Sequence, residues 1–354
     1  MISRKSILAV CACAMLAAGL AACGGGSSSG VSGDLAGAGS SAQQAAQEAW
    51  IAKFESDNSD VTISYDPVGS GGGREQFIAG GTDYAGSDSP YEGSELKGAE
   101  KQCGGPDNLV QIPDYISPIA IVYNLKGVDK LQLSAETIAG IFKQDITTWN
   151  DPAIAKDNPG VKLPSTRITP VNRSDDSGTT DNFTDYLSKA APSVWTYPPD
   201  DTWPVKGGEA ADGTSGVVEA VGAGDGTIGY ADASQAGDLG IAKIKVGNTY
   251  IDPSASGAAH DVEISKENKD IGGDKYVFAY DLERTSTDTA NYPIVLVSYL
   301  SACTQGDNAE AVGAYFDYII SPDGQNTAAS SAGSAPITDT VRNQIQPAVS
   351  AIGA

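Results

Sequence analysis

The sequence predicts an α/β layered fold, because segments with the alternation of β-strands occur between segments with helical periodicity. Residues 61–65 alternate apolar and polar side chains, as a strand with one buried face does. Residues 293–300 are almost continuously apolar and are long enough for a strand buried on both faces. The length of 354 residues exceeds that of one ordinary domain and suggests two.

In the first third of the chain, apolar spacing predicts a helix over residues 42–54, ahead of the strand at 61–65. Residues 69–74 are expected to form a glycine-rich turn that leads into a second helix beginning at Glu75. This turn lacks the Lys followed by Ser or Thr that a P-loop requires, so nucleotide binding by that route is rejected. Residues 83–90 should form a short strand that ends in a polar turn.

In the rest of the chain, the apolar run 116–122 predicts a buried strand that could pass between lobes, and Ser134 should cap a short helix. Residues 149–162 and 191–208 contain several prolines and are expected to be irregular. Strands are expected near residues 227–230, 243–251 and 276–282, and helices around residues 312–320, from Pro322 and from Thr338.

Residues 173–180, Arg-Ser-Asp-Asp-Ser-Gly-Thr-Thr, have the features of an oxyanion-binding turn. An extended run precedes them and a helical apolar rhythm follows, so Ser177 is expected to cap a helix. The first N–H groups of a helix lack internal partners and carry partial positive charge, which favours anions. Arg173 adds a planar set of donors. A capped surface helix with an exposed arginine is the alternative interpretation.

The N-terminus has the features of an exported lipoprotein. Two basic residues precede the apolar run 7–20, and small residues lead to Cys23, so residues 1–22 are predicted to be a signal peptide. The arrangement resembles the bacterial lipoprotein signal, in which the cysteine is lipidated; a membrane-anchor helix is the alternative. Residues 23–30 are predicted to be a flexible tether. We therefore expect an extracytoplasmic protein that is attached to the membrane through its lipid only.

The cysteines are expected to form one disulfide. Cys11 and Cys13 leave with the signal peptide, and Cys23 is committed to lipid. Cys103 and Cys303 remain, and two cysteines in an exported chain are expected to pair. Such a bridge would tie the early part of the chain to the late part.

The charge and the single histidine exclude several classes of function. The formal net charge is −23, and removal of Arg4 and Lys5 with the signal peptide leaves −25. A surface this acidic argues against nucleic acid and against electrostatic attraction to anionic lipid, so an anionic ligand must be held by local hydrogen bonds. His260 lies in a polar run and is expected in a solvated loop. One histidine makes a His-rich metal site or a Ser-His-Asp triad improbable, and we expect no metal and no cofactor.

Four polar segments occur along the chain: residues 37–41 (Gly-Ala-Gly-Ser-Ser), 69–72 (Gly-Ser-Gly-Gly), 83–88 (Asp-Tyr-Ala-Gly-Ser-Asp) and 173–179 (Arg-Ser-Asp-Asp-Ser-Gly-Thr). Their order and spacing, and the block 141–164, resemble the phosphate-binding proteins of bacterial phosphate ABC transporters. The resemblance covers essentially the whole mature chain.

The resemblance implies a two-lobed, periplasmic-binding-protein-like α/β fold with a ligand cleft between the lobes and two chain crossovers. Residues 31–119 and 292–354 would form lobe one, and residues 120–291 lobe two. Inorganic phosphate is the implied ligand, the membrane permease of a phosphate ABC transporter is the implied partner, and a monomer is expected. The implied ligand set is Ser41, the backbone at Ala42, Ser70, Asp88, Arg173, Ser177, Gly178 and Thr179, with Asp175 holding Arg173 in place.

Two positions depart from the family pattern. Ser41-Ala42 stands where the family often has Thr-Phe, so a hydroxyl is kept but an aromatic shield of the site is lost. Asp176 stands where glycine is common and is expected to point to solvent.

Three other functions stay open. A binding protein for sulfate, molybdate or another tetrahedral oxyanion is one; Asp88 argues against sulfate, because an ionised carboxylate needs a proton on the ligand. A secreted phosphoester hydrolase could use Ser41, Ser70 or Ser177, but the sequence has no histidine base near them and no metal-ligand cluster, so we do not expect an enzyme. A sensor or adhesin that uses the same fold is the third.

Overall fold

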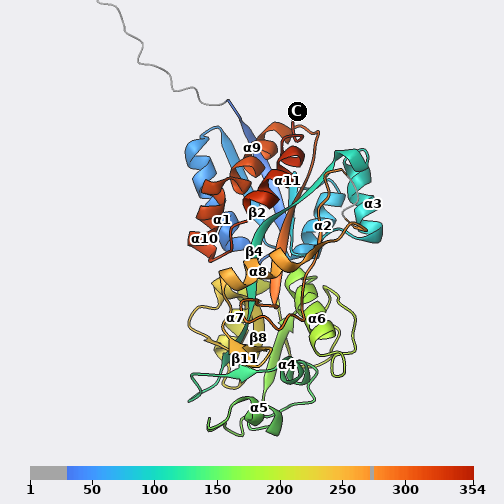
Figure 1. Ribbon diagram of the computed structural model, residues 1–354. Coiled ribbons are helices and arrows are strands. Elements are labelled where there is room, and N and C mark those ends of the chain that lie inside the picture. The colour runs from blue at the N-terminus through green and yellow to red at the C-terminus, as the bar shows by residue number, and fades with distance from the viewer. Residues whose placement is uncertain (1–29, 272–274) are drawn as a thin grey trace, which may run out of the picture. The chain divides into compact units, whose positions relative to one another are not determined.

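The computed structural model describes residues 30–271 and 275–354, and within them it has the predicted α/β architecture (Figure 1). The signal peptide, Cys23 and the tether up to residue 29 lie outside the described residues. One large sheet runs through the chain from residue 31 on. Its strands, in spatial order, are β2 (Val61–Asp66), β1 (Gly33–Gly39), β3 (Tyr84–Ser87), β14 (Val295–Cys303), β4 (Leu109–Asn124), β8 (Thr227–Asp232), β6 (Thr169–Arg173) and β7 (Glu209–Ala211), with β9 (Gly240–Ile241) also paired to β4.

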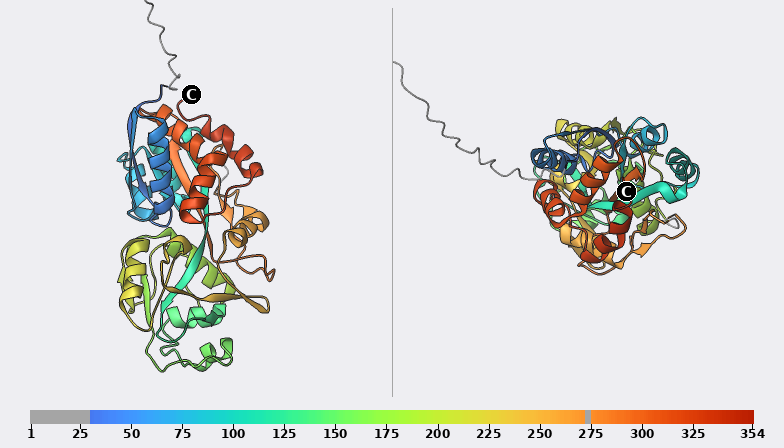
Figure 2. Two further views of the ribbon diagram at one scale, coloured as in Figure 1. Left: turned by 90° about the vertical axis from the view of Figure 1, so that its left-hand side faces the viewer. Right: turned by 90° about the horizontal axis from the view of Figure 1, so that it is seen from above.

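Strand β4 belongs to both halves of this sheet. From Leu109 to Pro118 it pairs antiparallel with β14, and from Ile119 to Asn124 it pairs antiparallel with β8. The returning chain lies beside it at this point, because Ile119 N donates to Ile294 O at 2.7 Å. The predicted buried strand in residues 116–122 is therefore confirmed, and Figure 2 shows it running from one group of helices to the other.

The helices divide into two groups along β4 (Figure 1). Around the half with β1–β3 and β14 lie α1 (Gln44–Asp57), α2 (Ser70–Ile78), α3 (Gly93–Gln102), α9 (Ala309–Ile320), α10 (Pro322–Ala332) and α11 (Asp339–Val349). Around the half with β6–β8 lie α4 (Ala135–Phe142), α5 (Pro152–Asp157), α6 (Gly178–Ala190) and α7 (Gly213–Ala223), and α8 (Ala255–Ile264) lies near the middle of β4. The remaining strands are β5 (Gln132–Leu133), β10 (Lys243–Val246), β11 (Thr249–Ile251), β12 (Lys266–Glu267) and β13 (Tyr280–Asp281).

Buried aromatic side chains hold the helices to the sheet. In the first half, Trp50 packs edge-on against Tyr115 with ring centroids 6.5 Å apart, and Phe54 packs against Tyr315 at 5.2 Å. In the second half, Phe183 stacks on Tyr230 at 4.5 Å, which presses α6 against β8. Such pairs add to the stabilisation that comes from area burial alone.

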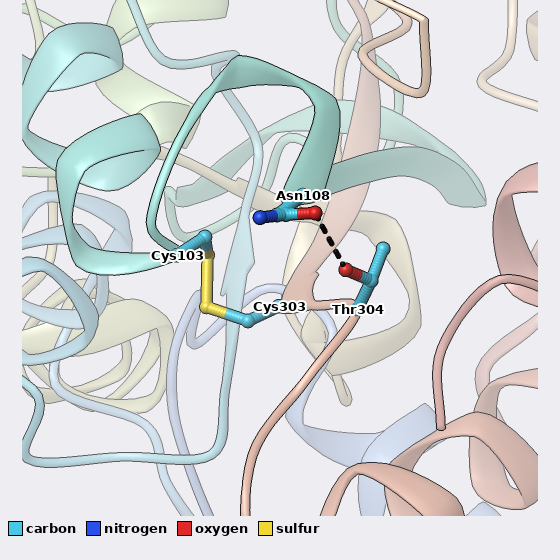
Figure 3. Close-up of a disulfide and its surroundings, with 4 residues drawn as sticks. All are labelled: Cys103, Asn108, Cys303 and Thr304. Atoms are coloured by element: carbon cyan, nitrogen blue, oxygen red, sulfur yellow. Dashed lines mark hydrogen bonds between the residues drawn. A yellow bond between two sulfur atoms is a disulfide. The ribbon is translucent and has the colours of Figure 1, made fainter. Parts of the chain in front are cut away.

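The predicted disulfide is confirmed (Figure 3). Cys103 follows α3 and Cys303 ends β14, their Cα atoms are 5.0 Å apart, and they are separated by 200 residues in sequence. Both cysteines lie in the half that contains the two ends of the described chain, beside the hydrogen bond from Thr304 Oγ1 to Asn108 Oδ1. Of the described helices, none combines the length and apolar character needed to cross a membrane.

Several local predictions were wrong. The glycine run after Ser70 is the first turn of α2 rather than a turn before it; a Cβ at Gly73 would lie 2.4 Å from Gly39 Cα, so the helix can approach β1 only without one. Residues 149–162 contain α5, since Asp151 Oδ1 caps Ala153 N and Pro152 starts the helix. Only Tyr280 and Asp281 of residues 276–282 form strand β13, and His260 lies in α8 rather than in a loop.

Candidate functional site

The N-terminus of α6 forms as the sequence predicts. β6 ends at Arg173, a short turn follows, and Ser177 adopts extended dihedral angles as the N-cap of α6. Ser177 Oγ accepts from Thr180 N at 3.2 Å. Because a hydroxyl has one donor and two acceptor positions, this cap leaves the Ser177 O–H available to an outside acceptor. Ser177, Gly178 and Thr179 are all buried.

Arg173 is buried and is held by Asp175. Arg173 Nε donates to Asp175 Oδ1 at 2.7 Å, and Nη2 pairs with Asp175 Oδ2. Asp175 also accepts from Gly213 N, the first residue of α7, at 3.1 Å. Desolvation raises the pKa of Asp175, but the hydrogen bonds and charge of Arg173 outweigh it and hold the pKa below its usual range. In residues 30–271 and 275–354 no hydrogen bond uses Arg173 Nη1, so this nitrogen keeps its N–H donors for a ligand.

Ser70 and Asp88 come from the other half of the sheet. Ser70 begins α2, and its Oγ accepts from Asp88 N at 3.0 Å, so the Ser70 O–H also keeps its donor. Asp88 follows β3, and its Oδ1 accepts from Ser298 Oγ on β14 at 2.5 Å. Both side chains are buried.

The two halves meet at these residues. Thr179 Oγ1 donates to Asp88 Oδ2 at 3.3 Å, and Gly71 N donates to Asp176 O at 3.0 Å. A Cβ built on Gly178 would lie 2.6 Å from Ser70 Oγ, so the start of α6 touches the start of α2. Two predicted segments, 69–72 and 173–179, are thus in direct contact although a hundred positions separate them in the chain.

Ser41 and Ala42 already have hydrogen-bond partners in the structure. Ser41 Oγ lies 3.0 Å from Thr214 Oγ1 and accepts from Thr214 N at 3.0 Å, so it meets the N-terminus of α7. Ala42 N donates to Ser40 Oγ at 3.1 Å and is already paired. The same buried region is therefore surrounded by four helix N-termini, those of α1, α2, α6 and α7. Each N-terminus contributes the partial positive charge of its helix dipole. The side chain of Asp176 is exposed, as predicted, with Oδ1 accepting from Thr202 Oγ1.

Asp88 is a buried carboxyl group with several partners. Burial raises the pKa of Asp88 above its usual range, while the hydroxyl groups of Ser298 and Ser40, and then the charge of Arg173, oppose this rise. Asp114, the extra residue where β4 shifts register against β14, lies close enough for the two charges to interact. Neither carboxylate oxygen of Asp114 has a hydrogen-bond partner among the described residues, and burial raises its pKa well above the usual range. Of the two, Asp88 has the partners that can hold a negative charge.

A cavity of about 490 Å³ lies beside the buried region around Arg173 but does not include it. Asp88 lines it, but Arg173 and residues 177–179 do not. Its lining has three basic and eight acidic residues: Arg74, Lys189 and Arg284 against Asp88, Glu92, Glu95, Asp181, Asp185, Asp200, Asp201 and Asp281. Arg74 is bonded to Glu95 and Asp201 at 2.8 and 2.6 Å, and Arg284 to Asp185 at 2.9 Å. The acidic excess makes this cavity a poor anion site, in contrast to the enclosed region around Arg173.

Comparison with known proteins gives the family. The PBP superfamily domain matches residues 25–323. The phosphate-binding protein PstS 2 of Mycobacterium tuberculosis is 35% identical over 380 residues, covering 96% of this chain and 98% of that protein. The phosphate-binding protein PstS 3 of Mycobacterium leprae is 34% identical over 329 residues, covering 90% and 86%. The chain belongs to the PstS family of phosphate-binding proteins.

Solved structures agree with the fold of this PstS-family chain. A periplasmic phosphate-binding protein, PfluDING, bound with phosphate, aligns with a TM-score of 0.70 at 22% identity, covering 89% of this chain and 93% of that one. A putative phosphate ABC transporter substrate-binding protein with bound phosphate from Clostridium perfringens aligns with a TM-score of 0.62 at 18% identity, covering 86% and 100%. The predicted periplasmic-binding-protein-like fold is thereby confirmed.

In this PstS-family member, four polar residues of the site were missed by sequence reasoning. They are Ser40, Asn182, Thr214 and Ser298, all buried. Ser298 carried a signal, because it is a hydroxyl within the apolar run 293–300. Thr214 follows a glycine at a helix start, as Ser70 does, and that composition could have indicated it. Ser40 precedes the predicted ligand Ser41, and only the folded chain turns its hydroxyl toward Asp88.

Proposed function

We propose that this protein captures inorganic phosphate between the two halves of its sheet and delivers it to the permease of an ABC transporter. The observation that carries the proposal is the meeting of two helix starts with unused donors. Ser70 and Ser177 each accept one backbone N–H and keep their O–H, and Arg173 keeps its Nη1 edge. Relatives named phosphate-binding protein, at 35% identity over nearly the whole chain, support phosphate as the anion.

The ligand set is proposed to be Ser41, the backbone at Ala42, Ser70, Asp88, Arg173, Ser177, Gly178 and Thr179, with Asp175 as the support of Arg173. For Ser41 and Ala42 the proposal requires that their present hydrogen bonds to Thr214 and Ser40 rearrange or be shared with the ligand. One arginine with several neutral donors suffices for an anion in a dry site, because each charge-assisted hydrogen bond is strong there.

The two halves are proposed to act as lobes that open and close. Lobe one would be residues 31–119 and 292–354, and lobe two residues 120–291. The change of partner of β4 from β14 to β8 after Pro118 supports this division. The contacts between Thr179 and Asp88 and between Gly71 and Asp176 then belong to the closed form.

Lipid attachment at Cys23 and an extracytoplasmic location belong to the same proposal, supported by the sequence of residues 1–30. No catalytic role is proposed for any residue. His260, the single histidine, lies 3.4 Å from Asp288 and 3.7 Å from Glu263, whereas Ser41, Ser70 and Ser177 are hydrogen-bonded to Thr214, Asp88 and Thr180.

Calorimetry tests the proposal. The chain from Gly24 onward is titrated with phosphate, arsenate and sulfate at one ionic strength. We expect one phosphate per chain, similar binding of arsenate because it is also protonated and tetrahedral, and much weaker binding of sulfate. Tight binding of sulfate with no binding of phosphate would support another oxyanion instead. Turnover of a chromogenic phosphoester would support the hydrolase alternative.

A further inference from the structure

Asn182 ties the Asp88 turn to helix α6. Its Nδ2 donates to Asp88 O at 2.7 Å and to Gly178 O at 2.9 Å. Asp88 follows β3 in one half of the sheet, whereas Asn182 and Gly178 belong to α6 in the other half. The side chain is 5% exposed, so water does not compete strongly for these bonds.

Arg284 determines which way the Asn182 amide faces. Arg284 Nη2 donates to Asn182 Oδ1 at 2.7 Å. A guanidinium has donors only, so the amide oxygen must face it and the amide nitrogen must face the two carbonyl groups. The opposite orientation would set donor against donor and acceptor against acceptor at three contacts.

The other donors of Arg284 fasten it in place. Nη1 donates to Pro293 O at 3.0 Å and to Val295 O at 2.7 Å, where the chain returns to enter β14. Nε donates to Asp185 Oδ2 at 2.9 Å on α6, which balances the charge. With 3% of its surface exposed and its donors occupied in this way, Arg284 is a fixed support.

We propose that Asn182, oriented by Arg284, is a positioning residue that latches the Asp88 turn onto the start of α6 and thereby slows the release of bound phosphate. The inference rests on the proposed function, and it concerns two residues outside the ligand set. Because Asn182 and Asp88 lie in different halves, the bond between them exists only when the halves are together. Its free energy therefore stabilises the closed form alone.

A latch of this kind acts on dissociation rather than on association. Phosphate enters while the halves are apart, when the bond is not formed, and leaves only after it breaks. The inference therefore predicts separate effects on the two rate constants. A residue that only supports folding would change neither in the folded population.

The test measures phosphate association and dissociation by stopped flow on the chain from Gly24 onward. In Asn182→Ala we expect the dissociation rate constant to rise about tenfold, as for one lost hydrogen bond in a dry interface, with association within about twofold of wild type. Asn158→Ala is the matched control. Asn158 is also a buried amide that donates to two carbonyl groups, Gln132 O at 2.7 Å and Ile154 O at 2.9 Å, but all three lie in one half. Its substitution should lower stability and leave both rates unchanged.

Arg284→Lys and the double variant test the role of Arg284. Lysine keeps the charge but cannot place donors on the same four groups, so Asn182 is no longer oriented. Arg284→Lys also loses the bonds to Pro293 O and Val295 O, so it is the reference for the double variant. Because Asn182 acts only when Arg284 orients it, adding Asn182→Ala to Arg284→Lys should not make phosphate release any faster. A double variant that releases phosphate faster than Arg284→Lys would show that Asn182 does not act through Arg284, and would overturn the proposed role of Arg284.

Asn182→Asp serves if Asn182→Ala does not fold. It has the same shape and keeps the acceptor for Arg284, but it has no N–H for Asp88 O, so release must again be faster. A folded Asn182 variant that releases phosphate at the wild-type rate overturns the inference alone. A wild-type chain that binds no phosphate overturns the proposed function, and the inference with it.

Discussion

Gly178 lies directly against Asp88. A Cβ built on Gly178 would be 2.7 Å from Asp88 Cβ and 3.0 Å from Asp88 Cα, closer than side-chain carbons approach. The absence of a side chain at the first residue of α6 is therefore what allows the two halves of the protein to meet.

Gly178→Ala should keep the halves apart. The methyl group would meet Ser70 Oγ and Asp88, neither of which can move freely because each is hydrogen-bonded. We expect phosphate binding to weaken by about a hundredfold, since closure of the site is lost. Gly222→Ala in α7 is the control, because its Cβ would meet nothing closer than Leu239 Cδ2 at 3.9 Å. Calorimetry measures the phosphate affinity of both variants. Equal affinities of Gly178→Ala and Gly222→Ala would contradict a role of the close contact in binding.

Asp88→Asn should reduce discrimination against sulfate. Near neutral pH phosphate carries at least one proton that an ionised Asp88 can accept, whereas sulfate would face the carboxylate with no proton to share. An amide supplies a donor and removes the repulsion, so the preference for phosphate over sulfate should fall by about tenfold or more. Competition of the two anions for wild type and variant at one ionic strength measures the ratio. A ratio that stays the same would mean that Asp88 does not detect the ligand proton.

Arg173→Lys should weaken phosphate binding by about a hundredfold or more, because an ammonium cannot bond Asp175 through two parallel contacts and still present a donor edge to the ligand. Arg167→Lys, at an exposed position, makes the same chemical change and keeps the same net charge. It should bind phosphate as the wild type does. Similar affinity in both variants would exclude a direct contact of Arg173 with the anion.

Removal of the disulfide should lower stability without changing phosphate affinity. The bridge joins residues 200 positions apart, so the chain-entropy model gives a loss of about 5 kcal/mol in the free energy of unfolding. Cys103→Ala with Cys303→Ala is compared with wild type by chemical denaturation. Affinity should be kept because both cysteines lie away from Asp88 and Arg173. Thiol titration of the unfolded, unreduced chain from Gly24 onward should find no free thiol, and two reactive thiols would contradict the bridge.

Stability should increase as the pH is lowered from about 7.5 to 5. Burial raises the pKa of Asp181, Asp232 and Asp261 to about 6 each, above the usual 3.8. Between these values the folded chain binds more protons than the unfolded chain, so the free energy of unfolding falls as pH rises. The lowered pKa of Asp175 has the opposite sign but acts only as the pH falls below about 4.

The midpoint of thermal unfolding is measured from pH 4.5 to 7.5 without phosphate, because a bound ligand would add its own pH dependence. Asp232→Asn should flatten part of the profile and raise stability at neutral pH. The amide oxygen of the variant can still accept from Ser234 N. The neutral amide also avoids the cost of burying the charged carboxylate that Asp232 carries at neutral pH. A profile that rises steadily up to pH 7.5 would contradict the prediction.

The sequence was sufficient where a local signal marks an element. Ser134, Ser177 and Thr338 were expected to begin helices, and each caps one with its hydroxyl oxygen. α3 and α7 were not predicted, because charged residues dominate one and small residues the other, so neither shows a clear apolar stripe in sequence.

The functional site was likewise predictable only in part. The four polar segments were recognisable one by one, and three of them meet where Gly178 contacts Ser70 and Asp88. The partners that complete the site were not recognisable, because Ser298 reaches Asp88 across 210 positions and Asn182 across 94. Such contacts depend on which strands become neighbours, and that follows from packing of the whole chain rather than from any local pattern.

The place of β14 in the sheet has a consequence for how the chain is made. β14 lies between β3 and β4, two strands from the first third of the sequence, yet it comes from residues 295–303. A chain released from its N-terminus displays the facing edges of β3 and β4 long before the strand that fills the gap emerges. The half that holds both ends of the described chain can complete its sheet only after nearly the whole polypeptide is available. During synthesis the early strands of this half must therefore remain unassembled until residues 295–303 have emerged.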